Sequence, residues 1–289
     1  MRLLIPGSLL LSICIFCSCA GPRNIHSTSP FVSPVSLEKG STAIEASYFT
    51  HGGQTNVPDS VSDNHDNALA FSIEHMVSPK TLVFGSMDVK EESNHFRDSI
   101  ALAGDPSYNA YDGGFDSSIV FGKRYTASVG VEFFSEQTTN ISKSLAITMG
   151  YHQVNMNESG LLMRNPYKRF YKLNQVSLSV QGNLLFKVTK RLDVAWIMRI
   201  TVLNSFKAHT DYSTQEKFNS GLRDNRVYGF FCPTGFYIHL KPFKNIPFYL
   251  NSQFFNDVAF WNRSSAKYEP GRTFIKGTGV STGMQYVFN

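Results

Sequence analysis

The chain has 289 residues, of which 42% are hydrophobic, 13% aromatic and only 17% charged, with a mean hydropathy of −0.17. This average is too polar for a bundle of membrane-spanning helices, and the apolar content is too high for a disordered chain. Four cysteines are too few for a disulfide scaffold, and a net charge of +5 is too small to indicate a nucleic-acid-binding protein. The remaining classes are a globular α/β protein, a β-sandwich and a membrane β-barrel, whose two-faced strands average to middling hydropathy.

The first 19 residues indicate a secretory signal peptide. One Arg precedes an apolar run at residues 9–16, which is too short for a permanent membrane helix. The run ends in Phe16-Cys17-Ser18-Cys19, so we expect cleavage between Ser18 and Cys19 and lipidation of Cys19. Two or more acyl chains there would anchor the protein stably. The alternative is an ordinary signal peptide with incidental cysteines.

Three segments are therefore expected along the chain. Residues 1–18 form the signal peptide. Residues 19–40 are proline-rich with little periodicity, which predicts an extended periplasmic tether or a plug segment. Residues 41–289 are expected to form one β-barrel domain. After removal of the signal peptide and lipidation of Cys19, Cys232 stands alone, so no intramolecular disulfide is expected.

Period-two alternation dominates the predicted barrel domain and indicates β-strands. In residues 116–134, one face carries Ile119 and Phe121, and the other carries Arg124 and Glu132. A helix would place apolar residues three and four apart, and no long stretch does so. The same alternation recurs in residues 176–188, 192–202 and 280–288.

Short and long connections alternate, as they do in outer-membrane barrels with short periplasmic turns and long external loops. Short turns are predicted near residues 78–80, 136–141, 189–191 and 241–246. Long loops are predicted at about 52–66, 92–115, 157–169, 207–225 and 258–274. The pattern predicts an all-β, antiparallel up-and-down transmembrane barrel of about ten strands (eight to twelve): 41–51, 67–77, 80–91, 116–135, 142–156, 170–188, 191–206, 226–241, 246–257 and 273–289. An even number puts both ends of the barrel chain on the periplasmic side.

Several short motifs lie in a recognisable order near the N-terminus. Cys19 is followed by Pro22-Arg23-Asn24, then by Glu38-Lys39-Gly40, and then by a strand-like stretch at residues 41–48. This order resembles a family of outer-membrane β-barrel lipoproteins common in Bacteroidota. The resemblance implies the barrel fold and the outer-membrane location. It implies no particular activity, since such proteins are mostly uncharacterised.

Catalytic motifs are not recognisable in the chain. A lipid hydrolase needs a hydroxyl beside a base, and the pairs that could be posed are His152 with Ser142 or Ser144, and His75 with Ser72. A cation could bind acidic side chains and a His, but the spacing of the candidates matches no established loop: Asp59, Asp63, His65 and Asp66. We therefore expect no enzyme, no metal site and no cofactor.

Glycines and aromatic residues are expected to have structural roles. Gly113-Gly114 and the series Gly277, Gly279 and Gly283 precede no helix that would form a phosphate loop, and interior Gly makes room in a crowded barrel. Aromatic residues at strand ends are expected to anchor the barrel at the membrane interfaces. These are Phe133, Phe134, Tyr167, Phe170, Tyr171, Tyr228, Phe230, Phe231, Phe248, Tyr249, Phe254, Phe255, Phe260 and Trp261.

The inward face is predicted to carry charge. In a narrow ten-stranded lumen, opposite charges are expected to pair across the barrel and form a plugged core, or alternatively to gate a small pore. The residues concerned are Glu45, Glu132, Lys187, Asp193 and Arg199.

The sequence thus predicts an outer-membrane lipoprotein barrel, anchored through Cys19 with a periplasmic N-terminus. Its role is expected to be structural, adhesive or surface-binding, through five long external loops. The alternatives are a narrow pore or translocon component, and a lipid-tethered periplasmic binding protein of lipocalin type. The expected partners are outer-membrane lipid, the barrel-assembly and lipoprotein-sorting machineries and an unknown extracellular ligand, but no nucleic acid.

Overall fold

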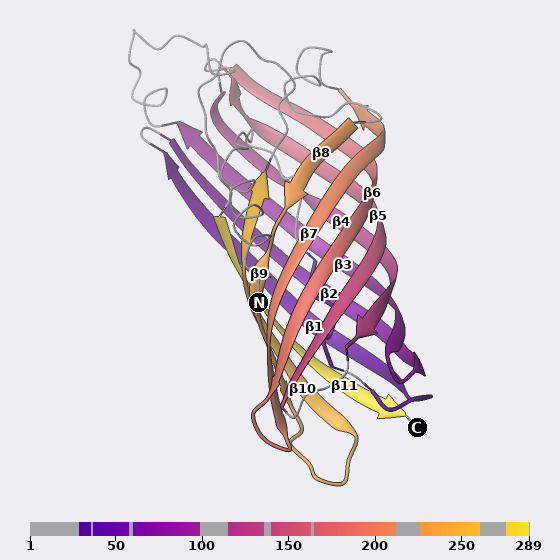
Figure 1. Cartoon of the computed structure of the whole chain (residues 1–289). Helices are drawn as coiled ribbons and strands as arrows, with labels where there is room; N and C mark the ends of the chain where they lie inside the picture. Colours follow the sequence, from indigo (N-terminus) through magenta and orange to yellow (C-terminus); the bar gives the residue numbers. More distant parts are fainter. Residues whose placement is uncertain are drawn as a thin grey trace, which may run out of the picture.

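A computed structural model describes residues 29–35, 37–57, 60–98, 115–135, 140–162, 165–211, 226–260 and 276–288. These residues form one antiparallel sheet that curls into a barrel of slanted strands (Figure 1). Within these ranges no helix is long and apolar enough to cross a membrane. The strands are β1 (Thr42–Val57), β2 (Ser60–Ser78), β3 (Thr81–Asp98), β4 (Phe115–Phe134), β5 (Ile141–Leu162), β6 (Asn165–Lys187), β7 (Leu192–Thr210), β8 (Arg226–Phe231), β9 (Thr234–Leu240), β10 (Phe248–Phe260) and β11 (Lys276–Phe288).

The barrel closes with ten strand positions, as the sequence predicts. β1 pairs with both β2 and β11, so the described sheet has no free edge there. β8 and β9 share one position between β7 and β10. They are separated at Cys232 and Pro233, because Pro has no N–H to donate to a ladder, although the Pro233 carbonyl still accepts from Arg199 N–H at 2.9 Å.

The strands are staggered, which gives the barrel its tilt. Hydrogen-bonded partners followed once around the barrel from Leu192 return to the same strand at Asn204, twelve residues further along. A barrel closes only when strands tilt and their register shifts in this way. We call the end with the β2–β3, β4–β5, β6–β7 and β9–β10 connections the short-turn end, and the opposite end the long-loop end.

Two predicted loops are strand instead. β1 and β2 pair up to Val57 and Ser60, and β5 and β6 pair up to Leu162 and Asn165. The predicted loops 52–66 and 157–169 are therefore wrong. Their residues are mainly polar and do not alternate with apolar ones, so the contrast between faces that marks a strand in the sequence is absent, while the ladder hydrogen bonds continue. The short turns predicted at 78–80, 189–191 and 241–246 are confirmed.

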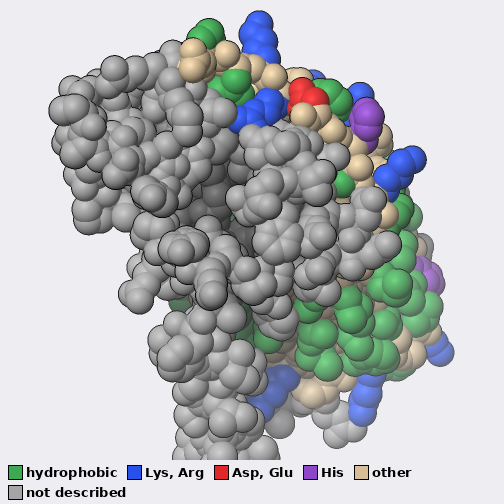
Figure 2. All heavy atoms as spheres, turned by 90° about the horizontal axis from the view of Figure 1, so that it is seen from above, with side chains coloured by type: hydrophobic (Ala, Val, Ile, Leu, Met, Phe, Trp, Pro, Cys, Tyr) green, Lys and Arg blue, Asp and Glu red, His purple; other side chains and the backbone are tan. Residues whose placement is uncertain are grey.

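The outward face carries an apolar belt next to the short-turn end. On β4 the outward side chains are Phe133, Val129 and Tyr125, and Lys123 follows them toward the long-loop end. The same change from apolar to polar occurs on neighbouring strands at Asn67, Glu91, Gln153, Asn174 and Asn204. The belt is about ten residues long on each of these strands, which matches a tilted strand crossing a bilayer. Hydrophobic side chains gather on the outer wall at the lower right of Figure 2.

Adjacent aromatic residues do not all anchor the outer surface. Phe133 and Phe254 point outward, but their neighbours Phe134 and Phe255 are buried, and so is Tyr171. Successive residues of a strand face opposite sides, so a pair of neighbouring rings cannot serve one rim. The prediction of aromatic anchors is wrong for these buried rings. The side chains of five further predicted anchors lie outside the described residues: Tyr228, Phe230, Phe231, Phe260 and Trp261.

Candidate functional site: the lumen and its N-terminal segment

Residues 29–35 lie inside the barrel, and we call them the lumen segment. Ser33 accepts a hydrogen bond from the Tyr237 hydroxyl at 3.1 Å, three residues before the end of β9. Ser29 lies deeper and donates to Asp88 on β3 at 3.2 Å. At the short-turn end, Val32 and Leu37 pack against a cluster that contains Met76, Leu82, Phe84, Phe134 and Ala146. The described part of the predicted tether or plug is therefore a plug.

Side-chain amides hold the main chain of the lumen segment from two walls. Gln253 on β10 accepts from Phe31 N–H at 2.9 Å and donates to the Phe31 carbonyl at 3.2 Å. Gln181 on β6 accepts from Val32 N–H at 3.1 Å and donates to the Val32 carbonyl at 2.9 Å. Each glutamine thus offers the donor and acceptor that a neighbouring strand would offer. Successive residues of an extended chain point their N–H and C=O groups to opposite sides, so the segment binds both walls.

Arg199 fixes the inner end of the segment. Its guanidinium donates from Nη1 to the Pro30 carbonyl at 2.9 Å and from Nη2 to the Ser29 carbonyl. The same group lies over the Phe31 ring, 4.9 Å from the ring centroid. Arg199 is buried in the lumen on β7, so charge-assisted hydrogen bonds and a cation–π contact act together in a site with little water.

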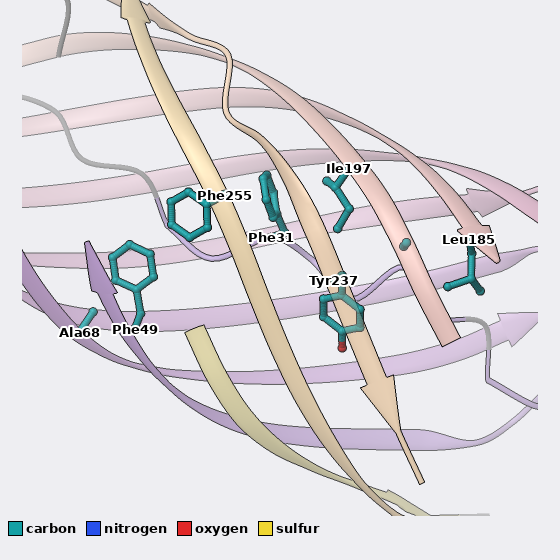
Figure 3. Packing of buried hydrophobic residues seen from close by; sticks show 8 residues of the cluster. Phe31, Phe49, Ala68, Leu185, Ile197, Tyr237 and Phe255 are labelled. Atoms are coloured by element: carbon teal, nitrogen blue, oxygen red, sulfur yellow. The ribbon is translucent and has the colours of Figure 1, made fainter. Parts of the chain in front are cut away.

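Phe31 fills an apolar pocket in the lumen wall. Its ring meets Phe255 edge-on with centroids 5.5 Å apart, and Phe255 stacks on Phe49 at 5.3 Å. Figure 3 shows these rings together with Ala68, Leu185, Ile197 and Tyr237. Gly279 makes room for Phe255, since a Cβ at this position would lie 2.1 Å from Phe255 Cζ. Gly283 is similarly close to Glu45, so the predicted packing role of glycine is confirmed at these two positions.

Spaces of different sizes lie beside the lumen segment. One, of about 70 Å³, is lined by Ser29, Arg124, His152 and Arg199, and another, of about 50 Å³, by Phe31, Glu45 and Asp88. A wider bowl of about 590 Å³ opens at the short-turn end. A drug-sized ligand needs about 300–1,000 Å³. The segment therefore occupies the deeper part of the described lumen, where the two small spaces remain, whereas the bowl at the short-turn end is of ligand size.

Three of the five predicted lumen charges are buried. Glu45 accepts from Asn251 Nδ2 at 2.8 Å, and Glu132 accepts from Asn183 Nδ2 at 2.9 Å. Together with Arg199, these groups bind amides and carbonyls where we expected opposite charges across the lumen. The remaining two lie opposite each other at the short-turn end, where Lys187 is exposed and Asp193 half-buried.

A buried ion pair deeper in the lumen was missed by sequence reasoning. Arg124 Nε donates to Glu92 Oε1 at 2.6 Å, Nη2 donates to Oε2 at 3.2 Å, and Nη1 donates to Gln175 at 3.2 Å. Both charged side chains are almost completely buried. Glu92 falls in the predicted loop 92–115, and this incorrect strand boundary concealed its inward orientation.

The predicted catalytic and metal candidates lie in other arrangements. His152 hydrogen-bonds Thr126 at 3.2 Å and Ser177 at 2.8 Å, and His75 contacts Thr42 at 3.0 Å. Asp66 approaches His51 at 3.4 Å, while the described residues contain no group of three or more His, Cys, Asp or Glu suited to a metal. Cys19, Ser18, Asp59 and Gly113-Gly114 lie outside the described residues, so cleavage and lipidation stay predictions.

Comparisons with known proteins identify the fold. No family model matches the chain, and no curated protein matches its sequence. The transport unit of the autotransporter AIDA-I from Escherichia coli superposes with a TM-score of 0.50 at 9% identity, over 89% of this chain and 94% of that chain. The outer membrane protease OmpT from Escherichia coli gives a TM-score of 0.49 at 9% identity, over 88% and 99%. At such low identity the likeness is one of fold alone. The chain is a closed ten-stranded antiparallel barrel of the kind found in outer-membrane proteins.

Proposed function

We propose that the protein is an outer-membrane barrel that spans the membrane with its short-turn half and extends its long-loop half outside the cell. The apolar belt supports this, because outward side chains such as Met87, Val129 and Met149 are more than 60% exposed and would face water in a soluble protein. A lipid-tethered soluble barrel is less compatible with such a surface. Beyond the belt, the strands continue for several residues as a mainly polar sheet, on which Phe121, Ile119 and Phe206 are also exposed.

A membrane-extraction experiment tests the span. We expect a Cys19→Ala variant to stay in the membrane pellet after alkaline carbonate treatment, and to migrate differently in SDS gels before and after boiling. If carbonate releases this variant, its barrel does not span the membrane. Metabolic labelling with a fatty acid tests the proposed lipidation separately, because only the unsubstituted chain should incorporate label at Cys19.

Within this location, we assign the protein a non-enzymatic role in structure, adhesion or surface binding. The observation that carries the assignment is the occupied lumen, in which side chains from β3, β6, β7, β9 and β10 hold the lumen segment. The long-loop half is then the part that can meet partners. We expect no conductance steps from the full chain in planar bilayers and no hydrolysis of phospholipid or lipid A. Reproducible steps would favour a pore, and hydrolysis would favour an enzyme.

A gated pore is the second candidate, and one observation favours it. The lumen segment is held by side chains and belongs to no strand ladder. Its departure would leave every described strand pairing in place. Conductance that appears only after the segment is altered would support this candidate.

A further inference from the structure

The lumen segment is bound as a peptide ligand is bound. In four consecutive residues, each main-chain carbonyl accepts a hydrogen bond from a wall side chain: Arg199 for Ser29 and Pro30, Gln253 for Phe31, and Gln181 for Val32. The two glutamines also accept from the N–H groups of the residues that they bind. Main-chain hydrogen bonds of this kind give affinity for any extended peptide.

Specificity would come from the side chains of the segment. Phe31 is 5% exposed and is enclosed by aromatic and aliphatic residues, with the Arg199 guanidinium over one face. Pro30 has no N–H group to donate, and it binds the lumen wall through its carbonyl oxygen, which accepts a hydrogen bond from Arg199. Ser33 meets the Tyr237 hydroxyl. These contacts favour an aromatic residue at position 31 and a hydroxyl group at position 33, and they tolerate proline at position 30.

From these contacts we infer that the lumen contains a peptide-binding site for an extended Ser-Pro-Phe-Val-Ser sequence, which the chain fills with its own residues 29–33. The inference rests on the proposed barrel and goes beyond it, since it gives the lumen a ligand class. A peptide of this type, supplied by another molecule, would bind once the chain's own segment has left.

The covalent connection explains why the site is occupied. A segment joined to β1 through a few residues has an effective concentration of about millimolar at its site, so a free peptide competes poorly with it. Binding of an added peptide must therefore be measured on a chain whose own segment no longer fits. We choose the full-length chain with residues 29–35 replaced by seven alternating Gly and Ser residues, because its length and strands are unchanged.

The experiment measures binding in detergent micelles with a fluorescent Ser-Pro-Phe-Val-Ser-Pro-Val peptide. We expect saturable binding to the replaced chain, at least tenfold weaker binding to the unsubstituted chain, and at least tenfold weaker binding of a control peptide with Ala in place of Phe. Absence of saturable binding to a folded, heat-modifiable replaced chain would overturn the inference. Equal binding of the two peptides would overturn the assigned role of the Phe pocket.

A second variant keeps the inference testable if the first variant does not fold. Phe31→Ala removes the ring that fills the apolar pocket and leaves every wall side chain of the site unchanged. We expect this variant to bind the added peptide at least tenfold more tightly than the unsubstituted chain does, and binding as weak as that of the unsubstituted chain would count against the site. Failure of the proposed function is distinguishable, because carbonate extraction and conductance of the unsubstituted chain report on it, and peptide binding in micelles does not.

Discussion

Two neighbouring glutamates on β3 show that the direction in which a side chain points decides whether its ion pair is exposed or buried. Glu91 points outward and meets Lys123 at 3.0 Å, with the two side chains about half exposed, whereas Glu92 points inward and meets Arg124 in full burial. An exposed pair is worth little because water and salt screen it. A buried pair costs desolvation, but removal of one partner leaves an uncompensated charge in the lumen.

Glu92→Gln should therefore destabilise the barrel by about 3–5 kcal/mol, because Arg124 keeps its charge and loses its carboxylate. Glu91→Gln is the matched control and should cost at most about 1 kcal/mol. The free energy of unfolding, measured by guanidinium titration in lipid vesicles, checks both values. Equal losses for the two variants would contradict the buried pair.

Gly279 gives a second prediction at the scale of a residue. Gly279→Ala places a Cβ against the Phe255 ring, which must then turn away from Phe49 and Phe31. Overpacking of this kind costs about 1–3 kcal/mol. Gly182→Ala is the control, since a Cβ there meets nothing within 4 Å. Thermal unfolding followed by gel shift should separate the two variants, and identical midpoints would show that the lumen accommodates the methyl group.

At the scale of the strand, one element crosses two environments. The outward face of β4 is apolar from Phe133 to Tyr125, and polar Lys123 marks the edge of the belt. Phe121 and Ile119 also point outward on this strand, but they lie beyond that edge. The same substitution should therefore have different effects at two positions of the same face.

Val129→Lys should cost about 2–4 kcal/mol, because it places a charge near the middle of the belt. Ile119→Lys should cost at most about 1 kcal/mol, as expected near or beyond an interface. Unfolding in lipid vesicles measures both. If the Ile119 variant loses as much as the Val129 variant, the membrane covers more of the barrel than the belt indicates.

The β5–β6 hairpin beyond the belt should be dispensable for assembly. Replacement of residues 158–169 by Asn-Gly would shorten both strands and join Asn157 to Phe170 through a tight turn. We expect normal membrane insertion and heat modifiability, because the removed residues lie outside the apolar belt. A variant that fails to insert would show that this hairpin supports folding.

At the scale of the whole molecule, orientation decides which end meets partners. The four connections at one end are short, whereas the β3–β4, β7–β8 and β10–β11 connections at the other end are long. Outer-membrane barrels have short turns in the periplasm and longer loops outside. Exposed basic residues crowd the short-turn end, where lipid phosphates can neutralise them: Lys39, Lys80, Lys143, Lys187, Lys190, Arg191 and Lys244.

An epitope inserted between Leu162 and Asn165 should be labelled by antibody on intact cells. The same epitope inserted at Lys190 should be labelled only after permeabilisation. The reverse pattern would show that the barrel is inserted with the opposite orientation.

Much of the architecture could be predicted from local pattern. Alternation predicts the strands because the two faces of each strand contact different media, and the ten positions and the short turns follow from it. The failures at 52–66, 157–169 and Glu92 share one cause. Where both faces meet polar surroundings, alternation disappears, although the backbone still needs its ladder hydrogen bonds.

The sequence by itself determined which residues of each clearly alternating strand share a face, because side chains alternate with a period of two on any strand. It did not assign Glu92, Phe134 and Phe255 to the inner face, where they lie buried. Only the tertiary structure decided what fills the lumen. Phe31 and Gln253 are 222 positions apart, and their contact exists only because closure of the barrel brings β10 to the start of the chain. No local sequence pattern encodes a contact between residues so far apart. The proline-rich stretch could equally form a tether by its composition, and only the structure shows that its described residues are bound in the lumen as a plug.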